Sequence, residues 1–379
     1  MLDSSILHTL ALSHIPKIGS INTRQLVSYF SGAEPVFTAP KGKLLRVPGI
    51  GPKIVDIIIE HRAKALEKAQ LSISRLADNK EGELIVLGSE KYPSRLQKEN
   101  DAPLLLFKAG KADLNPPKTI GIVGTRKATP YGVEATKNIV AELAQYNVQI
   151  ISGLAYGIDI AAHKAALDCG LSTVGVMANG LDRIYPAVHR KTAALMQENG
   201  ALLTEHDFGV EAEAYQFPAR NRIIAGMSDA LIVVEASSKG GALITADIAD
   251  SYNRDVFAVP GSIFSEVSKG TNNLIYQQKA ICYTGIQCLE YMTGWLDSLP
   301  TGENNQPKKP EQLTLNLDSL QPSERLVVEF LFKHPQAHID EISRATLITM
   351  SEISSVLLNL EFSGTVRSMP GKKFTLAKY

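Results

Sequence analysis

The residues best suited to chemistry stand in the run TIGIVGTRKATPYG, from Thr119 to Gly132. A short apolar strand, Ile120 to Val123, is expected to end at Gly124-Thr125-Arg126, and a helix is expected after Gly132. A glycine turn between a strand and a helix directs backbone N–H groups and the positive helix end to one spot, which attracts an anion. The guanidinium of Arg126 adds a planar fork of donors suited to phosphate. An ordinary turn with a solvated arginine explains the same residues equally well.

The elements around this run indicate a sheet. From residue 83 to about residue 285, short apolar runs such as LIVLG, VQIISG, ALIVVEA and VFAVPG alternate with helix-length segments. Apolar strands separated by helices indicate a parallel sheet with both faces covered. Ligands of such sheets bind at the carboxyl ends of the strands, so a site is expected in the residues just after each run.

Glycines, basic residues and amide or hydroxyl side chains recur in these segments. The candidate binding residues are Gly124, Thr125, Arg126, Lys127, Gly153, Tyr156, Phe217, Arg220, Asn221, Arg222, Gly240, Gly241, Thr245, Lys269, Thr271 and Asn272. The basic members could engage phosphates, while Phe217 and Tyr156 could stack on bases, as in proteins that bind single-stranded nucleic acid without sequence preference. Alone, Phe217 is more often a core residue; beside Arg220 and Arg222, a stacking role is favoured.

Catalytic groups do not accompany these residues. His163 has no His or Cys partner at ligand spacing, so no metal site is expected. No Gly-x-Ser-x-Gly elbow occurs, and no cysteine stands beside a plausible base. SKGGALIT lacks the lysine of a phosphate-binding GxxxxGK[ST] loop, and IGIVGTRKATPYG is not GxGxxG. We therefore expect no cofactor and no enzymatic activity.

Composition sets the class of protein. The 379 residues include 39 basic and 39 acidic side chains, so a basic site must be local. Three cysteines, Cys169, Cys282 and Cys288, match neither a metal set nor a disulfide framework, which suits a reducing cytoplasm. We expect no signal peptide and no membrane span, because the N-terminus has no basic n-region and no apolar run is long enough to cross a bilayer.

Residues 1–66 are expected to form a helical domain. Gly49-Ile50-Gly51, followed by Pro52, resembles the turn of a helix-hairpin-helix, or of a SAM-like domain, in which Gly49, Gly51 and Lys53 would face a DNA phosphate. A degenerate copy carries Lys17 at the position of the first glycine. A hairpin used only for packing is the slightly favoured alternative.

The C-terminal part is expected to form a winged helix over residues 319–379, after a flexible linker at 296–318 and a sheet domain at 67–295. Three helical stretches precede the hairpin-like TVRSMPGKKFTLA. Met350 to Gly364, the expected third helix, contains no Lys or Arg, so duplex reading by that helix is disfavoured.

The series GTRKATPYG, SGLAYGIDIAAH, NGLDRIYP, FPARNRIIAG, SSKGGALITA, VFAVPG and KGTNNLI resembles the DNA processing protein A family (DprA, or Smf) in order and spacing. The resemblance implies an extended Rossmann-like α/β domain that dimerises, binds single-stranded DNA, protects it and loads the RecA recombinase during natural transformation. It also implies that Arg126 contacts a DNA phosphate and that Phe217 stacks on a base.

Two alternatives remain open. The Gly240-Gly241 loop with Thr245 resembles the phosphate loop of the phosphoribohydrolases called LOG proteins, whose motif Pro-Gly-Gly-x-Gly-Thr-x-x-Glu carries a catalytic glutamate. Here Thr245 is followed by Ala246-Asp247, which leaves that carboxylate in doubt. The other alternative is a dimeric scaffold without DNA affinity.

Overall fold

The computed structural model describes residues 4–78, 82–295, 321–334, 337–363, 365–369 and 373–376. The chain divides into two compact units, residues 1–299 and 300–379. The predicted linker at 296–318 lies outside the described residues.

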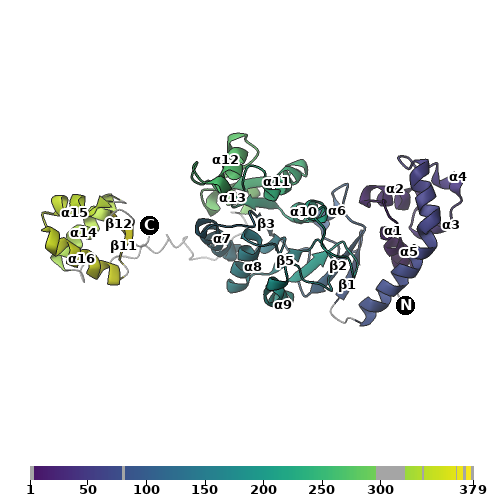
Figure 1. The fold of residues 1–379 in the computed structure, drawn as a ribbon, viewed down its shortest axis with the longest axis horizontal. Helices are drawn as coiled ribbons and strands as arrows, with labels where there is room; N and C mark the ends of the chain where they lie inside the picture. Colours follow the sequence, from purple (N-terminus) through teal and green to yellow (C-terminus); the bar gives the residue numbers. More distant parts are fainter. Residues whose placement is uncertain are drawn as a thin grey trace, which may run out of the picture. The chain divides into compact units, whose positions relative to one another are not determined.

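The first unit is built on one large sheet (Figure 1). Among the described residues it has nine strands in the order β1-β2-β6-β5-β4-β3-β7-β8-β9. Strands β3 to β9 pair in parallel, while β2 pairs antiparallel with both β1 and β6. The strands are β1 (Gly82–Val86), β2 (Leu105–Gly110), β3 (Thr119–Val123), β4 (Gln149–Ser152), β5 (Thr173–Val176), β6 (Ala201–Thr204), β7 (Ala230–Val233), β8 (Asp255–Ala258) and β9 (Ile281–Cys282).

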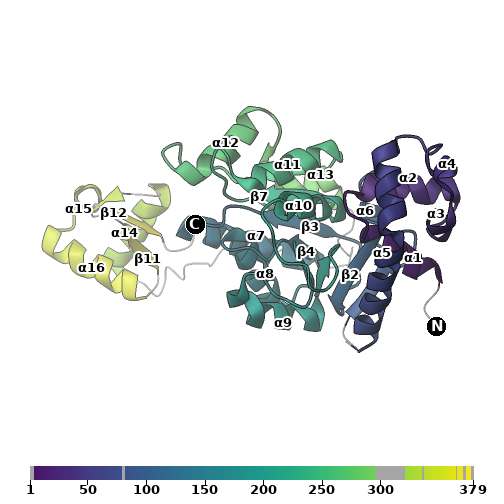
Figure 2. The same ribbon diagram turned by 45° about the vertical axis from the view of Figure 1, so that its right-hand side comes forward.

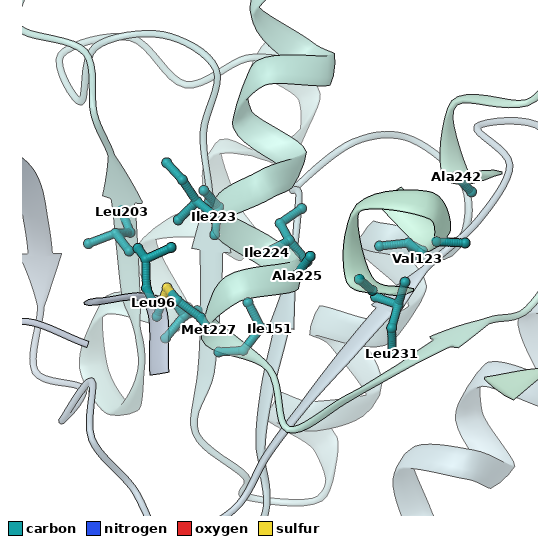
Figure 3. Close-up of a cluster of buried hydrophobic side chains, with 14 of the residues drawn as sticks. Leu96, Val123, Ile151, Leu203, Ile223, Ile224, Ala225, Met227, Leu231 and Ala242 are labelled. Carbon is teal, nitrogen blue, oxygen red and sulfur yellow. The ribbon is translucent and has the colours of Figure 1, made fainter. Parts of the chain in front are cut away.

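Helices cover both faces of the sheet, as the unbroken apolar strands predict. One face packs against α10, α11 and α12, and the other against α7, α8, α9 and α13. On the first face, Ile223 and Ile224 of α10 lie against strand residues such as Ile151 and Leu203 (Figure 3). The helices are α6 (Ser94–Gln97), α7 (Pro130–Leu143), α8 (Ile158–Asp168), α9 (Arg190–Asn199), α10 (Gln216–Met227), α11 (Gly241–Ser251), α12 (Lys269–Tyr276) and α13 (Ile286–Thr293).

The strand order reverses at the centre of the sheet. From β3 the chain proceeds through β4 and β5 to β6, and from β7 it proceeds through β8 to β9 toward the opposite edge. Strands β3 and β7 are direct neighbours, with Val123 opposite Val233 at their carboxyl ends. Loops that leave such a pair diverge to opposite faces and leave a crevice where ligands of open α/β sheets bind.

The N-terminal helices contain two similar turns. In each, a residue with positive φ, Lys17 (63°) or Gly49 (76°), precedes a buried isoleucine, a glycine and the start of a helix. The turn with Lys17 therefore repeats the backbone conformation of the Gly49 turn, although lysine adopts positive φ less readily than glycine. The helices are α1 (Ser4–Ser13), α2 (Ser20–Phe30), α3 (Glu34–Thr38), α4 (Lys41–Leu44) and α5 (Pro52–Asp78).

Helix α5 runs past residue 66, so the boundary predicted there falls inside a helix. Apolar residues of these helices share one core cluster with Leu105 and Phe107 of β2. Ser72 of α5 donates a hydrogen bond to Asp207, after β6, and His14 Nε2 lies 3.1 Å from the same carboxylate. The helical domain thus packs against the antiparallel edge of the sheet.

The second unit has the winged-helix order that the sequence predicts. Helices α14 (Pro322–Lys333), α15 (Ile339–Thr346) and α16 (Met350–Phe362) accompany a sheet of β10 (Ala337–His338), β12 (Lys373–Leu376) and β11 (Val366–Met369), in that spatial order. In the part of the chain that the structure describes, no helix combines the length and the hydropathy needed to span a membrane.

Candidate functional site

A hollow of about 530 Å³ opens at the carboxyl ends of β3 and β7, where the strand order reverses. Nine of the sequence-predicted residues line it: Gly124, Thr125, Arg126, Phe217, Arg220, Asn221, Gly240, Gly241 and Thr245. They come from the loop after β3, the first turns of α10 and the first turns of α11. Segments separated by about a hundred residues therefore form one wall, as expected for an open α/β sheet.

Arg126 and Phe217 contact each other across the hollow. The guanidinium carbon of Arg126 lies 4.7 Å from the centre of the Phe217 ring, a cation–π distance. Tyr185 approaches Phe217 from another side, with ring centres 5.9 Å apart and planes tilted by 52°. Phe217 is half-buried and belongs to none of the apolar core clusters of the described residues. A basic group and an aromatic ring are thus presented together at the opening.

The start of α7, where the sequence suggests an anion, already holds one from the protein itself. Glu235, which follows β7 and is 1% exposed, accepts hydrogen bonds from the backbone N–H (3.0 Å) and the hydroxyl of Thr129, the N-cap of α7. A Cβ at Gly132 would lie 2.3 Å from this carboxylate. The carboxylate complements the positive end of the helix, so an external phosphate does not fit at this point.

The start of α11 is open by contrast. Its N-cap is Gly240, no side chain caps it, and its first turn contains no acidic residue. The first turn of the helix, with Gly241 and Ala242, therefore lines the hollow without a counter-charge from an acidic residue of its own. A Cβ at Gly241 would meet no atom within 4 Å, so a side chain there would project into open space.

Other predicted glycines serve packing. A Cβ at Gly124 would lie 2.5 Å from the Ile158 side chain, and one at Gly153 would lie 2.4 Å from the guanidinium of Arg220. These two glycines allow close approach beneath the hollow, whereas Gly241 keeps the hollow open.

Arg220 lies under the hollow, 3% exposed. Its Nη1 donates to the carbonyl oxygens of Gly153 and Val176, at the ends of β4 and β5, and its Nε donates to Asn221 Oδ1 at 3.1 Å. Burial lowers the pKa of this guanidinium to about 10, although the nearby carboxylate of Asp159 acts in the opposite direction. Burial raises the pKa of the Asp159 carboxyl, and the positive charge of Arg220 opposes that rise. Arg220 therefore ties strand ends together as a buried, charged group.

His163 of α8 continues this buried polar layer. Its Nδ1 lies 2.7 Å from Thr173 Oγ1, and that hydroxyl donates to Ile150 O at 2.9 Å. Nδ1 therefore carries the proton. Burial, with the positive charge of Arg220, lowers the pKa of His163 to about 3. The imidazole is neutral and acts as a structural group.

The remaining predicted residues do not line the larger hollow. Gly153 and Tyr156 line a smaller hollow of about 30 Å³ that shares Arg126, Tyr185 and Phe217 with the first. Arg222 forms an ion pair with Glu205, and Lys269 forms one with Glu266 at 2.6 Å. Thr271 and Asn272 bond to Ser268 and Gly261, while Lys127 is exposed beside Arg126. In the helical domain, Lys53 is exposed and a Cβ at Gly51 would meet no atom within 4 Å.

Two residues of the site were missed from the sequence. Tyr185 lines both hollows, and its position in the loop after β5, at the same sheet edge, was the available signal. Glu235 was missed because its role depends on Thr129, which is 106 positions away in the chain.

The lining offers little for catalysis. Among the described residues, Asp159 is the one carboxylate that lines the hollow, and it is buried. Asp247, the carboxylate nearest in sequence to the position of the LOG glutamate, pairs with Lys279 at 2.8 Å on the surface. The described residues contain no His, Cys, Asp and Glu group that could hold a metal ion. The residues that line the hollow can bind an anionic group and stack against a planar ring.

Comparisons with known proteins identify the family of the chain. The family model described as DNA recombination-mediator protein A matches residues 83–292, and the DprA winged helix domain matches residues 310–372. The chain belongs to the DNA recombination-mediator protein A family. It is 31% identical to protein Smf of Synechocystis sp., over 99% of each chain, and 35% identical to protein Smf of Escherichia coli, over 76% of each.

Two solved structures of this family are similar to the chain. DNA processing protein A from Streptococcus pneumoniae matches 73% of this chain and 98% of its own, with a TM-score of 0.56 and 32% identity. DNA processing protein A from Helicobacter pylori, described with a unique single-stranded DNA binding mode, matches 56% of this chain and 94% of its own, with a TM-score of 0.51 and 30% identity. The predicted family, α/β fold and winged helix are confirmed.

Proposed function

We propose that this protein is a cytoplasmic, non-enzymatic recombination mediator that binds single-stranded DNA in the hollow between β3 and β7. The observation that carries the proposal is the pairing of Arg126 with Phe217 at its opening, 4.7 Å apart. A charged track combined with aromatic platforms binds single strands without sequence preference, because every base has a stacking face.

Electrostatics support a strand rather than a nucleotide. Glu235 occupies the start of α7, where a dinucleotide fold would place its phosphate. The open start of α11 and the exposed Arg126 remain for phosphates. The smaller hollow beside Tyr156 shares Arg126, Tyr185 and Phe217 with the larger one.

The finer role follows from family membership. We propose that the protein forms a homodimer through its Rossmann-like domain, protects incoming single strands during natural transformation, and loads RecA onto them. The related structure from Helicobacter pylori, described for its single-stranded DNA binding mode, supports the DNA part of this proposal. Loading is tested by measuring RecA filament formation on single strands that are coated with a single-strand-binding protein, in the presence and in the absence of this chain.

The binding test compares Arg126→Ala with wild type in fluorescence anisotropy titrations of a labelled oligothymidylate. Loss of one phosphate contact should weaken binding and reduce the slope of log affinity against log salt by about 0.7. The control is Lys191→Ala, an exposed lysine on α9, which should keep both affinity and slope. Unchanged affinity and slope in Arg126→Ala would remove Arg126 from the interface.

Incubation with nucleoside monophosphates tests the phosphoribohydrolase alternative. The binding proposal expects no release of free base, because Asp247, the carboxylate nearest in sequence to the glutamate of that motif, pairs with Lys279 on the surface. Release at an ordinary enzymatic rate would overturn it.

A further inference from the structure

The loop after β8 displays two apolar side chains. Ile263 is 73% exposed and Phe264 is 91% exposed, the highest value among the large hydrophobic side chains of the described residues. Single exposed apolar residues are common on protein surfaces. Two adjacent exposed apolar side chains, one of them an aromatic ring, near the proposed binding hollow suggest a function.

Hydrogen bonds hold this loop in place. Asn272 donates to Gly261 O at 3.0 Å and accepts from Gly261 N at 3.1 Å, and the hydroxyl of Tyr131 donates to Pro260 O at 2.8 Å. Ser265 N donates to Ser262 O at 3.0 Å, which closes a turn around the pair. The exposure of Phe264 is therefore a property of a fixed turn.

The same loop is bonded directly to the wall of the hollow. Ala236, a lining residue, donates its N–H to Val267 O at 2.7 Å and accepts from Gly270 N at 2.8 Å. Phe264 is three residues from Val267, so their Cα atoms are at most about 10 Å apart. Helices α11 and α12, which flank this region, lie on one side of the sheet in both views (Figures 1 and 2).

Basic residues flank the connection. Lys239 stands exposed in the loop that leads to α11, and Lys269 stands exposed at the start of α12. The pair of Lys269 with Glu266 at 2.6 Å is solvent-exposed, with the two side chains 52% and 64% accessible, so it is weak and can exchange for a phosphate. The segments around the connection thus expose two lysines and one glutamate together with the aromatic ring of Phe264.

We propose that Phe264, supported by Ile263, is a second stacking platform for the strand whose other part lies at Arg126 and Phe217. Lys239 and Lys269 hold the phosphates between the two platforms. This assignment rests on the proposed function, and it gives Lys269 and Asn272 distinct tasks: the lysine contacts the strand, and the asparagine fixes the loop that carries Phe264. A DNA strand is favoured over a protein partner because the flanking lysines and the bonded continuity with the hollow match a polyanion.

Oligothymidylates of two lengths, about 2 and about 16 nucleotides, test the proposal by fluorescence anisotropy, because the longer strand spans a typical single-strand site and the shorter one cannot reach from the hollow to Phe264. Phe264→Ala should weaken binding of the longer strand about tenfold and leave the shorter strand, which fits the first hollow, unchanged. Leu347→Ala, which removes a side chain that is 90% exposed in the winged helix, serves as the control and should change neither. Phe264→Trp should retain the affinity, and its added fluorescence should be quenched by the longer strand.

Unchanged binding of both strands by Phe264→Ala would overturn the second platform, as would equal loss for both lengths. The failure of the proposed function itself has a different signature, because Arg126→Ala would then leave binding of both strands intact.

Discussion

Arg126 and Phe217 form a cation–π contact in the structure, so their contributions to the free energy of DNA binding depend on each other. A base that stacks on Phe217 must share or replace the guanidinium that lies 4.7 Å from the ring centre. We predict that the strand replaces it, with Arg126 turning to a phosphate. Breaking an exposed cation–π contact costs about 0.5–1 kcal/mol. The free energy of DNA binding by the wild type therefore includes this cost.

The magnitudes follow from a double-mutant cycle. Phe217→Ala should lose about 1–3 kcal/mol of stacking, and Arg126→Ala should lose one phosphate contact, but each single variant also avoids the cost of separating the pair. The double variant avoids that cost only once. It should therefore bind more weakly than the sum of the single losses predicts, by about 0.5–1 kcal/mol, or about two- to fivefold.

Anisotropy titrations at one fixed salt concentration measure the cycle, with thermal melting to confirm that all variants fold. Losses that add within about 0.3 kcal/mol would show that the two side chains are independent. A double variant that loses less than the sum would mean that guanidinium and ring stay stacked in the complex, and would refute the exchange.

Three further predictions concern the layer that supports the site. Gly241→Val should weaken single-strand binding and leave the melting temperature near that of wild type, since its side chain would enter open space at the start of α11; a large loss of thermal stability would contradict this. Gly153→Ala should instead lower the melting temperature, because the added methyl group would meet the Arg220 guanidinium, 2.4 Å away; unaltered stability would show that the guanidinium can move. His163→Gln should reduce the dependence of the free energy of unfolding on pH in the acid range. The pKa of His163 is about 3 in the folded state and about 6.5 in the unfolded state, so between these values only the unfolded chain binds the proton. The free energy of unfolding of the wild type therefore decreases by about 1.4 kcal/mol for each pH unit of acidification in this range. Urea unfolding between about pH 4.5 and pH 6 measures that slope, and equal slopes in both proteins would refute the assignment.

The sequence predicts the parallel sheet more completely than it predicts the positions of the site residues. Apolar strands that end at Gly124 or Gly153 predict a parallel sheet and its functional edge, because both properties depend on local pattern. Arg220 and Arg222 show the limit. They stand two positions apart in the same helix and therefore point in different directions, one toward the strand ends and one toward Glu205. No pattern in FPARNR tells which is buried.

Contacts between distant segments account for the remaining differences. The carboxylate of Glu235 reaches the start of α7 only because β3 and β7 are neighbours in the sheet. The candidate anion site is therefore not the start of α7, the helix that follows Arg126, but the hollow between the turn at Arg126 and the start of α11. In the helical domain, Lys17 makes the first hairpin turn a degenerate copy in sequence, yet its φ of 63° reproduces the positive φ of Gly49, because lysine can adopt this conformation at a modest cost.

A titration of single-stranded and duplex DNA of equal length, at several salt concentrations, tests the central claim most directly. Binding in a hollow that offers one ring and a few phosphate contacts should favour the single strand at every salt concentration, with a slope of about 0.7 for each phosphate engaged. Equal or tighter binding of the duplex, or no measurable binding of the single strand at low salt, would contradict the account.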